Sequence, residues 1–128
     1  MKSGLRRLGV LTFLARFLLP AVLALHLQAS GQVIISEFLA NNVSGLRDEH
    51  GNLSDWIEVF NTTNTTVNMD GWFLTDSAGN LTKWRFPATN LPPSGFLVVF
   101  ADNTNQAILG LPLHAPFALS GGGEYLAL

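Results

Sequence analysis

The chain has 128 residues, of which 48% are hydrophobic and 12% charged, and it contains no cysteine. This length suits one domain with its own core, and the apolar composition excludes an intrinsically disordered chain. The absence of cysteine excludes a disulfide framework, a cysteine nucleophile and a thiolate metal site. From Gln32 onward three basic residues stand against nine acidic ones, which gives this part a formal net charge of −6. Such an acidic domain repels phosphate, which excludes nucleic-acid binding as a general function.

Residues 1–31 have the pattern of a secretory signal peptide. A basic segment ends at Arg16, the apolar run 17–25 follows, and Ala29-Ser30-Gly31 offers the small residues that a signal peptidase reads. Because Arg16 interrupts the apolar residues, the run is shorter than the roughly 20 residues of a membrane-spanning helix. We therefore expect a signal-peptide helix, cleavage before Gln32, no stable membrane span afterwards, and a secreted or cell-surface protein.

Short segments with strand-like patterns follow one another along the rest of the chain. Alternating or continuous apolar residues, many of them β-branched or aromatic and bounded by turn residues, favour strands. The expected strands cover 33–39, 56–61, 71–76, 82–86, 96–101, 117–119 and 125–128, with a short edge strand at 65–67. Short strands at this spacing predict an all-β sandwich.

Side-chain alternation and residue size predict where the core lies. Ile57 and Val59 share one face of their strand. Trp72, Trp84 and Phe86 are expected in the core, because aromatic residues supply most of the burial in a small sandwich. The segment 96–101 is apolar throughout, which predicts a central strand covered on both faces.

Two connections between the expected strands are long. Residues 40–54 form a polar loop, and loops of this length are often functional. Residues 102–116 are expected to form an irregular crossover that contains one helical turn at 105–109.

Five motifs, in this order, resemble the lamin-tail domain family in its bacterial, secreted branch. They are Val33-Ile34-Ile35-Ser36-Glu37, Asp55 to Asn61, Asp70 to Asp76, Phe86-Pro87, and Pro93 to Val99. The residues that carry the resemblance are Glu37, Trp56, Glu58, Asn61, Gly71, Trp72, Phe86, Pro87 and Gly95.

The resemblance implies an immunoglobulin-like β-sandwich over residues 32–128 and a non-catalytic module. Such modules commonly stand near the N-terminus of larger exported proteins, some with a spore-coat-type kinase domain. Family members usually continue with further strands after a segment similar to 124–128. The resemblance therefore implies that this domain lacks its last strands and that the chain is the N-terminal portion of a longer product.

The 40–54 loop and its end contain candidate ligands for a calcium ion. Asp48, Glu49, Asn52 and Asp55 lie around Gly51, and hard cations prefer several oxygen ligands from a turning backbone. Their spacing does not match the alternating ligands of an EF-hand loop. The alternative is a solvated acidic loop in which Asp55 binds backbone amides.

Glu37 and Glu58 fall on strands that are expected to be neighbours, and paired carboxylates are the groups that glycosidases use. The alternative is that each binds backbone amides or pairs with Arg85 or Lys83. His50 and His114 are interpreted as loop histidines, since neither has a metal-ligand partner at the usual spacing. No Gly-x-Ser-x-Gly elbow is present to anchor a catalytic triad.

Aromatic residues suggest a possible contact surface for a sugar. Trp56, Phe73 and Trp84 would form its platform, although Trp84 is also expected in the core. Phe73 is the best candidate for an exposed contact, because it points away from Trp72 and Leu74.

These observations predict an exported, non-enzymatic module with a structural, adhesion or protein-interaction role. Calcium is the one cofactor considered for it. Its expected partner is a protein or a glycan at the cell surface. The alternatives are a carbohydrate-binding module, or the accessory domain of a larger secreted enzyme whose catalytic part lies beyond Leu128.

The signal-peptide pattern predicts the mass of the exported protein. Cleavage before Gln32 should remove residues 1–31, because the small residues Ala29 and Gly31 occupy the two positions that the peptidase reads. Intact-mass spectrometry of the exported protein checks this. A protein that keeps Met1 and stays in the membrane fraction would contradict it.

Overall fold

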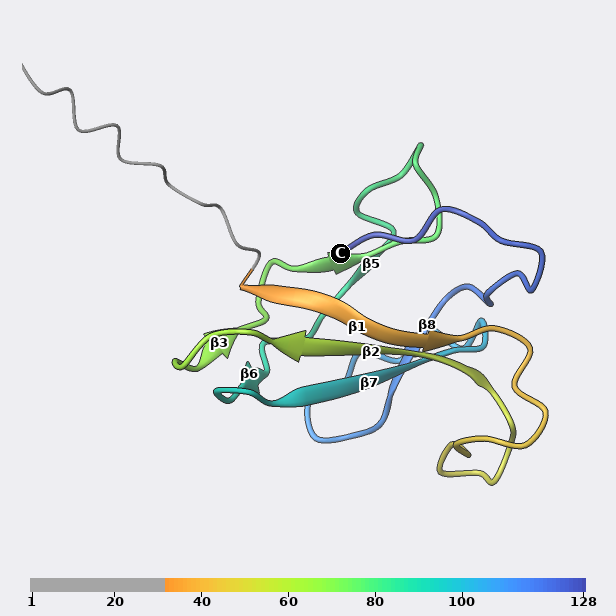
Figure 1. Cartoon of the computed structure of the whole chain (residues 1–128), viewed down its shortest axis with the longest axis horizontal. Coiled ribbons are helices and arrows are strands. Elements are labelled where there is room, and N and C mark those ends of the chain that lie inside the picture. Colours follow the sequence, from red (N-terminus) through yellow and green to blue (C-terminus); the bar gives the residue numbers. More distant parts are fainter. Residues whose placement is uncertain (1–31) are drawn as a thin grey trace, which may run out of the picture.

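The computed structural model describes residues 32–128 and shows an all-β domain, so the predicted fold class is confirmed (Figure 1). The predicted signal peptide lies outside these residues. The strands are β1 (Val33–Leu39), β2 (Asp55–Asn61), β3 (Val67–Asn68), β4 (Phe73–Leu74), β5 (Trp84–Arg85), β6 (Asn90–Leu91), β7 (Phe96–Ala101) and β8 (Leu113–Ala115). The described part has no helix that is long and apolar enough to cross a membrane.

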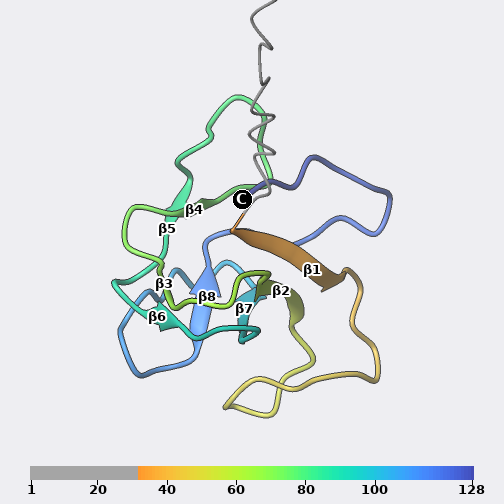
Figure 2. The ribbon, with the colours of Figure 1, turned by 60° about the vertical axis from the view of Figure 1, so that its left-hand side comes forward.

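The main sheet has the strand order β1-β2-β7-β8. Its first three strands are antiparallel, and β8 joins β7 in parallel. Two small antiparallel sheets, β3-β6 and β4-β5, lie on one side of the main sheet, as Figures 1 and 2 show. The molecule therefore has an inner face of the main sheet that packs on the small sheets, and an outer face that points away from them.

The core fills the space between the two layers. From the main sheet, Ile57, Val59 and Val99 are fully buried, which confirms the face predicted for Ile57 and Val59. From the second layer come Val67, Met69, Leu74, Trp84, Phe86 and Leu91, followed by Phe117 and Leu119. Trp84 and Phe86 meet edge to face with ring centroids 4.9 Å apart, a favoured aromatic geometry.

The buried side chain of Asn61, at the end of β2, connects the two layers. Its amide nitrogen donates hydrogen bonds to the carbonyl oxygens of Thr65, Leu91 and Pro92 at 2.8–3.0 Å. Its side-chain oxygen accepts from the backbone nitrogen and the hydroxyl of Thr63 at 2.9 and 2.8 Å. One side chain thus satisfies the backbone of the turn after β2 and of the turn after β6.

Gly95 completes this corner next to Asn61. Its carbonyl oxygen accepts a hydrogen bond from the backbone nitrogen of Asn61 at 3.0 Å. A Cβ atom at position 95 would lie 2.7–2.9 Å from atoms of Pro92, so only glycine fits without a shift of the turn. The close approach explains a glycine at this position without any requirement for a positive φ.

β1 carries a bulge at Ser36. Ile35 pairs with Val59 and Glu37 pairs with Glu58, so Ser36 is the extra residue of the edge strand. Bulges are common at sheet edges, where they increase the local twist and disturb the row of unpaired backbone groups.

The structure corrects several expectations for the second half of the chain. Residues 105–109 form no helical turn, and the crossover contains β8, which the sequence analysis missed. The strand expected over 71–76 is only two residues long, and those expected over 117–119 and 125–128 are reduced to single bridges at Ala118 and Ala127.

Burial also differs from expectation at two positions. Trp72 is only partly buried at the edge of the core, although Trp84 and Phe86 are fully inside as predicted. β7 is central in the sheet, but it is covered on both faces only in its second half, where Val99 and Phe100 are buried, whereas Phe96 at its start is 58% exposed.

The different burial of the tryptophans predicts different effects on stability. Trp84→Ala should lower the free energy of unfolding by about 3–5 kcal/mol, the usual cost of deleting a core aromatic side chain. Trp72→Ala should cost roughly 1–2 kcal/mol, since only part of the ring is removed from water. Urea titration of both variants measures the difference.

Trp84→Phe is the matched control. It keeps a ring in the core and removes the indole N–H, which is buried without a hydrogen-bond partner. Trp84→Phe should therefore lower the free energy of unfolding less than Trp84→Ala does. Equal losses for Trp72→Ala and Trp84→Ala would contradict the burial described here.

Candidate interaction surface

The outer face of the main sheet presents side chains in three rows across the strands, because paired residues of neighbouring strands point to the same face. The first row is Ile34, Phe60 and Phe96; the second is Glu37, Glu58 and Val98; the third is Leu39, Trp56, Phe100 and His114. Sandwich strands usually place polar residues outward, so seven apolar side chains at these ten positions are unusual.

The first row is an exposed apolar ladder formed by Ile34, Phe60 and Phe96. The rings of Phe60 and Phe96 stack with centroids 4.6 Å apart. Phe96 is 58% and Ile34 43% exposed, and neither is covered by another part of the described chain. Contiguous exposed apolar side chains of this kind mark interaction sites on soluble proteins.

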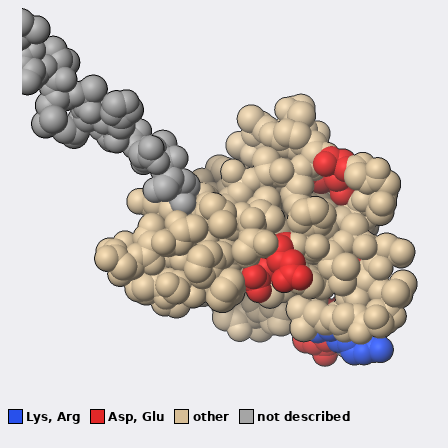
Figure 3. Space-filling model, in the orientation of Figure 1, with Lys and Arg blue, Asp and Glu red and all other residues tan. Residues whose placement is uncertain are grey.

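The second row contains a pair of glutamates in direct cross-strand register. Glu37 of β1 lies opposite Glu58 of β2, which confirms that the two strands are neighbours. The Ser36 hydroxyl donates to Glu58 Oε1 at 2.8 Å. Figure 3 shows the resulting acidic patch in the middle of the sheet face, over β1 and β2.

Neither glutamate pairs with Lys83 or Arg85, contrary to one of the alternatives considered from sequence. Lys83 binds Asp76 at 2.7 Å, and Arg85 binds Asp70 at 2.7 Å. Within residues 32–128, neither carboxylate accepts a hydrogen bond from a backbone amide. The Glu58 carboxylate accepts one from the Ser36 hydroxyl instead.

The 40–54 loop covers the end of the third row, because Glu49 of this loop contacts His114. The imidazole Nδ1 lies 2.8 Å from Asp102 Oδ2, and Nε2 lies 3.1 Å from Glu49 Oε2. His114 is only 2% exposed, and its ring is 5.3 Å from that of Phe100. The interpretation of His114 as a loop histidine is therefore wrong, whereas His50 does lie exposed on the loop.

Protonation of His114 satisfies both carboxylates. Burial alone would lower the pKa of His114, but the hydrogen bonds and charges of Asp102 and Glu49 outweigh it and raise the pKa above its ordinary value of 6.5. The pKa of Glu49 is lowered from 4.5, chiefly by a backbone hydrogen bond, with His114 contributing. Both ring nitrogens are occupied, so His114 has none free to activate a nucleophile.

The proposed calcium ligands do not converge on one point. Asp48 is buried, and its two oxygens accept hydrogen bonds from His50, Asn52 and Ser54 at 2.8–3.2 Å. Asp55 accepts from the Asn42 backbone at 3.0 Å, as the alternative reading expected, while Glu49 turns to His114. Within residues 32–128, no group of three His, Cys, Asp or Glu side chains could hold a metal ion.

Hydrogen bonding also explains the acidity of Asp48. Burial raises the pKa of this carboxyl, but the bonds from Asn52, Ser54 and His50 outweigh it and lower the pKa from 3.8 to about 2. The carboxylate therefore organises the loop from inside, and the loop is not the fully solvated acidic segment that the alternative described.

The aromatic platform expected from sequence is not formed. Trp84 is in the core, Phe73 is half-buried on β4 in the second layer, and Trp56 lies on the outer face. The exposed aromatic residues are instead Phe96, Phe38 and Tyr125. The alternation of Phe96, Val98 and Phe100 could have identified Phe96 as an outward residue once β7 was paired with β2.

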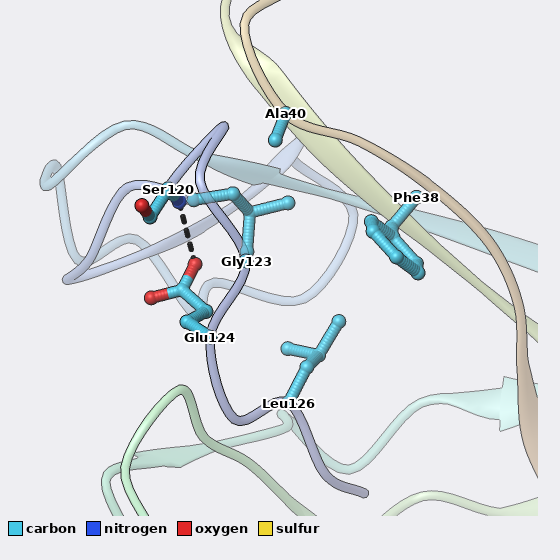
Figure 4. Close-up of a pocket in the computed structure, with 7 residues that line it drawn as sticks. Phe38, Ala40, Ser120, Gly123, Glu124 and Leu126 are labelled. Carbon is cyan, nitrogen blue, oxygen red and sulfur yellow. Dashed lines mark hydrogen bonds between the residues drawn. The ribbon is translucent and has the colours of Figure 1, made fainter.

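A small apolar pocket opens beside the end of β1. Phe38 and Ala40 line it on one side, and Leu119 and Leu126 on the other, while Glu124 folds back to accept a bond from the Ser120 nitrogen at 2.6 Å (Figure 4). Its volume is about 110 Å³, below the roughly 150 Å³ of a cavity that holds benzene. The pocket can take one aliphatic side chain but is too small for a sugar ring.

Comparison with protein families gives a match over most of the chain. The family model described as Lamin Tail Domain matches residues 26–126, which include every strand of the main sheet. No curated protein and no solved structure shows detectable similarity.

The His114 cluster predicts how stability depends on pH. Because its pKa is raised in the folded state, the stabilisation is fully present below pH 6.5 and is lost as pH rises through the folded-state pKa. The free energy of unfolding, measured by urea titration at a series of pH values, should therefore fall on the alkaline side of pH 6.5.

His114→Gln should remove most of this decline, since glutamine does not titrate. His50→Gln is the matched control. His50 is exposed on the 40–54 loop, so this variant should leave the decline unchanged. A decline of the same size in His114→Gln would contradict the assignment.

Proposed function

The chain belongs to the lamin tail domain family, and from this premise we propose that it is an exported, non-catalytic module that binds a partner protein through the outer face of its main sheet. Lamin tail domains are generally non-catalytic. The signal-peptide pattern of residues 1–31 supports export.

The observation that carries this function is the exposed ladder of Ile34, Phe60 and Phe96. Interfaces are enriched in aromatic residues, and a few well-placed aromatic side chains supply most of the binding energy. The ladder lies on a regular, rigid sheet, so a partner can bind it without ordering a flexible segment.

Non-catalytic function is also supported by the other polar clusters. Glu37 and Glu58 stand on an open sheet face, outside the pocket beside β1, whereas glycoside hydrolysis needs a site that encloses the sugar. The buried His114 is fully engaged with two carboxylates.

Carbohydrate binding is the second candidate, and the stacked rings of Phe60 and Phe96 are the observation that favours it. A flat aromatic pair on a sheet could stack against a sugar ring. The exposed aliphatic Ile34 in the same ladder favours an apolar protein segment over a polar sugar.

A selection experiment separates the two candidates. The full-length protein should select peptides from a random phage-displayed library, and Phe96→Ala should weaken their binding roughly tenfold or more, as expected for a central aromatic contact. Ile108→Ala is the matched control, because Ile108 is 56% exposed but lies in the crossover after β7.

Glycan-array binding is measured in parallel with the same variants. Binding of glycans but not of peptides, lost in Phe96→Ala, would replace the proposed function by carbohydrate binding. Peptide binding that Ile108→Ala abolishes and Phe96→Ala preserves would show that the outer face is not the binding surface.

A further inference from the structure

The glutamate pair of the outer face carries a cost that nothing in the described chain offsets. Glu37 and Glu58 are directly opposite on neighbouring strands, where like charges destabilise the sheet. The Ser36 hydroxyl binds Glu58, but it carries no charge. Glu37 is exposed and has neither an ion pair nor a hydrogen bond to another side chain of residues 32–128.

The basic residues of this part of the chain are engaged elsewhere. Lys83 and Arg85 bind Asp76 and Asp70 in the second layer, and Arg47 donates to the Gly51 carbonyl within its own loop at 2.6 Å. Figure 3 shows no basic residue beside the central acidic patch, and the visible basic atoms lie over the loop between β1 and β2. Within residues 32–128, no lysine or arginine is therefore left to neutralise the pair.

The surroundings of the pair suit a long basic side chain better than a metal ion. Two carboxylates fall short of the six to eight oxygen ligands that calcium takes. On β2, Glu58 stands between Trp56 and Phe60, and Phe60 stacks on Phe96. An aliphatic stem can lie on these rings while the charged head reaches the carboxylates, and an arginine can also stack on an aromatic face.

We infer that the partner of the outer face is a basic protein segment, which places an arginine or lysine head between Glu37 and Glu58 and its stem against Phe60 and Phe96. This inference rests on the proposed function and specifies the chemistry of its partner. A glycan is disfavoured, because neutral hydroxyl groups would not relieve the repulsion between the two carboxylates.

Binding of a defined peptide tests the inference. The probe is a short synthetic peptide in which arginine alternates with leucine, so that an extended chain presents arginine on one side. The comparison peptide contains citrulline, which is neutral but has nearly the shape of arginine. Calorimetry with the full-length protein should show binding that weakens as salt rises, and binding of the citrulline peptide about tenfold or more weaker.

Charge-neutralising variants locate the effect. The double variant Glu37→Gln/Glu58→Gln should bind the arginine peptide about as weakly as the wild type binds the citrulline peptide. Its affinity for the citrulline peptide should be little lower than that of the wild type. Losses that do not add in this way are the signature of a direct pair. Glu124→Gln is the matched control, because it removes one acidic charge from the C-terminal segment, and its amide oxygen can still accept the bond from Ser120.

A second readout needs no ligand. Glu37→Gln should raise the melting temperature of the free protein, because it removes the cross-strand repulsion. An unchanged or lower melting temperature would overturn the inference that the pair is unbalanced.

The outcomes separate the inference from the proposed function. Peptides whose binding is weakened by Phe96→Ala, but which bind the double variant Glu37→Gln/Glu58→Gln as tightly as the wild type, would overturn the inference. The proposed function would then stand. Equal losses in Glu124→Gln and Glu37→Gln, each of which removes one charge, would show attraction to the overall negative charge and overturn the inference. Binding of glycans alone, or of neither ligand, would overturn both.

Discussion

The buried side chain of Asn61 is the interaction on which the arrangement of the two layers depends. It lies at the end of β2, in the middle of the main sheet, and binds carbonyl oxygens that belong to the second layer. The Leu91 carbonyl ends the short strand β6 and the Pro92 carbonyl lies in the turn after it, and an unsatisfied buried polar group costs about 1–3 kcal/mol. The short side chain of Asn61 supplies a donor for these carbonyl groups and an acceptor for Thr63.

This corner also determines where the outer face begins. The carbonyl oxygen of Gly95, directly before β7, accepts a hydrogen bond from the backbone nitrogen of Asn61, in line with the register of β7 against β2. The register brings Phe96 opposite Phe60, and a shift of one residue would turn Phe96 toward the core. The register that exposes the ladder thus includes a backbone hydrogen bond of Asn61, next to the side-chain bonds that join the two layers.

Local patterns predicted the antiparallel strands of the main sheet well. β1 and β7 have the predicted bounds, and β2 begins one residue earlier than predicted, because each strand alternates or is bounded by clear turn residues. β8 was missed because Leu113 to Ala115 is too short to show a pattern, and its parallel pairing with β7 depends on a crossover rather than on local signals.

The candidate surface was less predictable for the same reason. Glu37 and Glu58 were recognised as neighbours, but their exact opposition depends on the bulge at Ser36, which no turn residue marks. The exposure of Phe96 depends on the absence of a layer over the outer face. The burial of His114 depends on Glu49, which is far away in the sequence and reaches it from the 40–54 loop.

The outer face divides into a closed end and an open end. At the closed end, the buried imidazole of His114 pairs with the carboxylates of Asp102 and Glu49. At the open end, two like charges stand beside aromatic rings with no basic side chain of residues 32–128 paired to them. Proteins retain destabilising arrangements of this kind mainly where binding requires them, so the unbalanced end is the one to associate with function.

The hydrogen bonding of Asn61 has a consequence for the choice of expression host. Asn61-Thr62-Thr63 matches the acceptor pattern for N-linked glycosylation, as does Asn42-Val43-Ser44. The amide nitrogen that would receive the glycan is the same atom that donates to the buried carbonyls, and the Asn42 amide is likewise bonded to Leu46 and Ser54. A sugar attached during synthesis in a eukaryotic secretory pathway would therefore occupy the space and the donors that hold the two layers together, so a host without this modification suits the native fold.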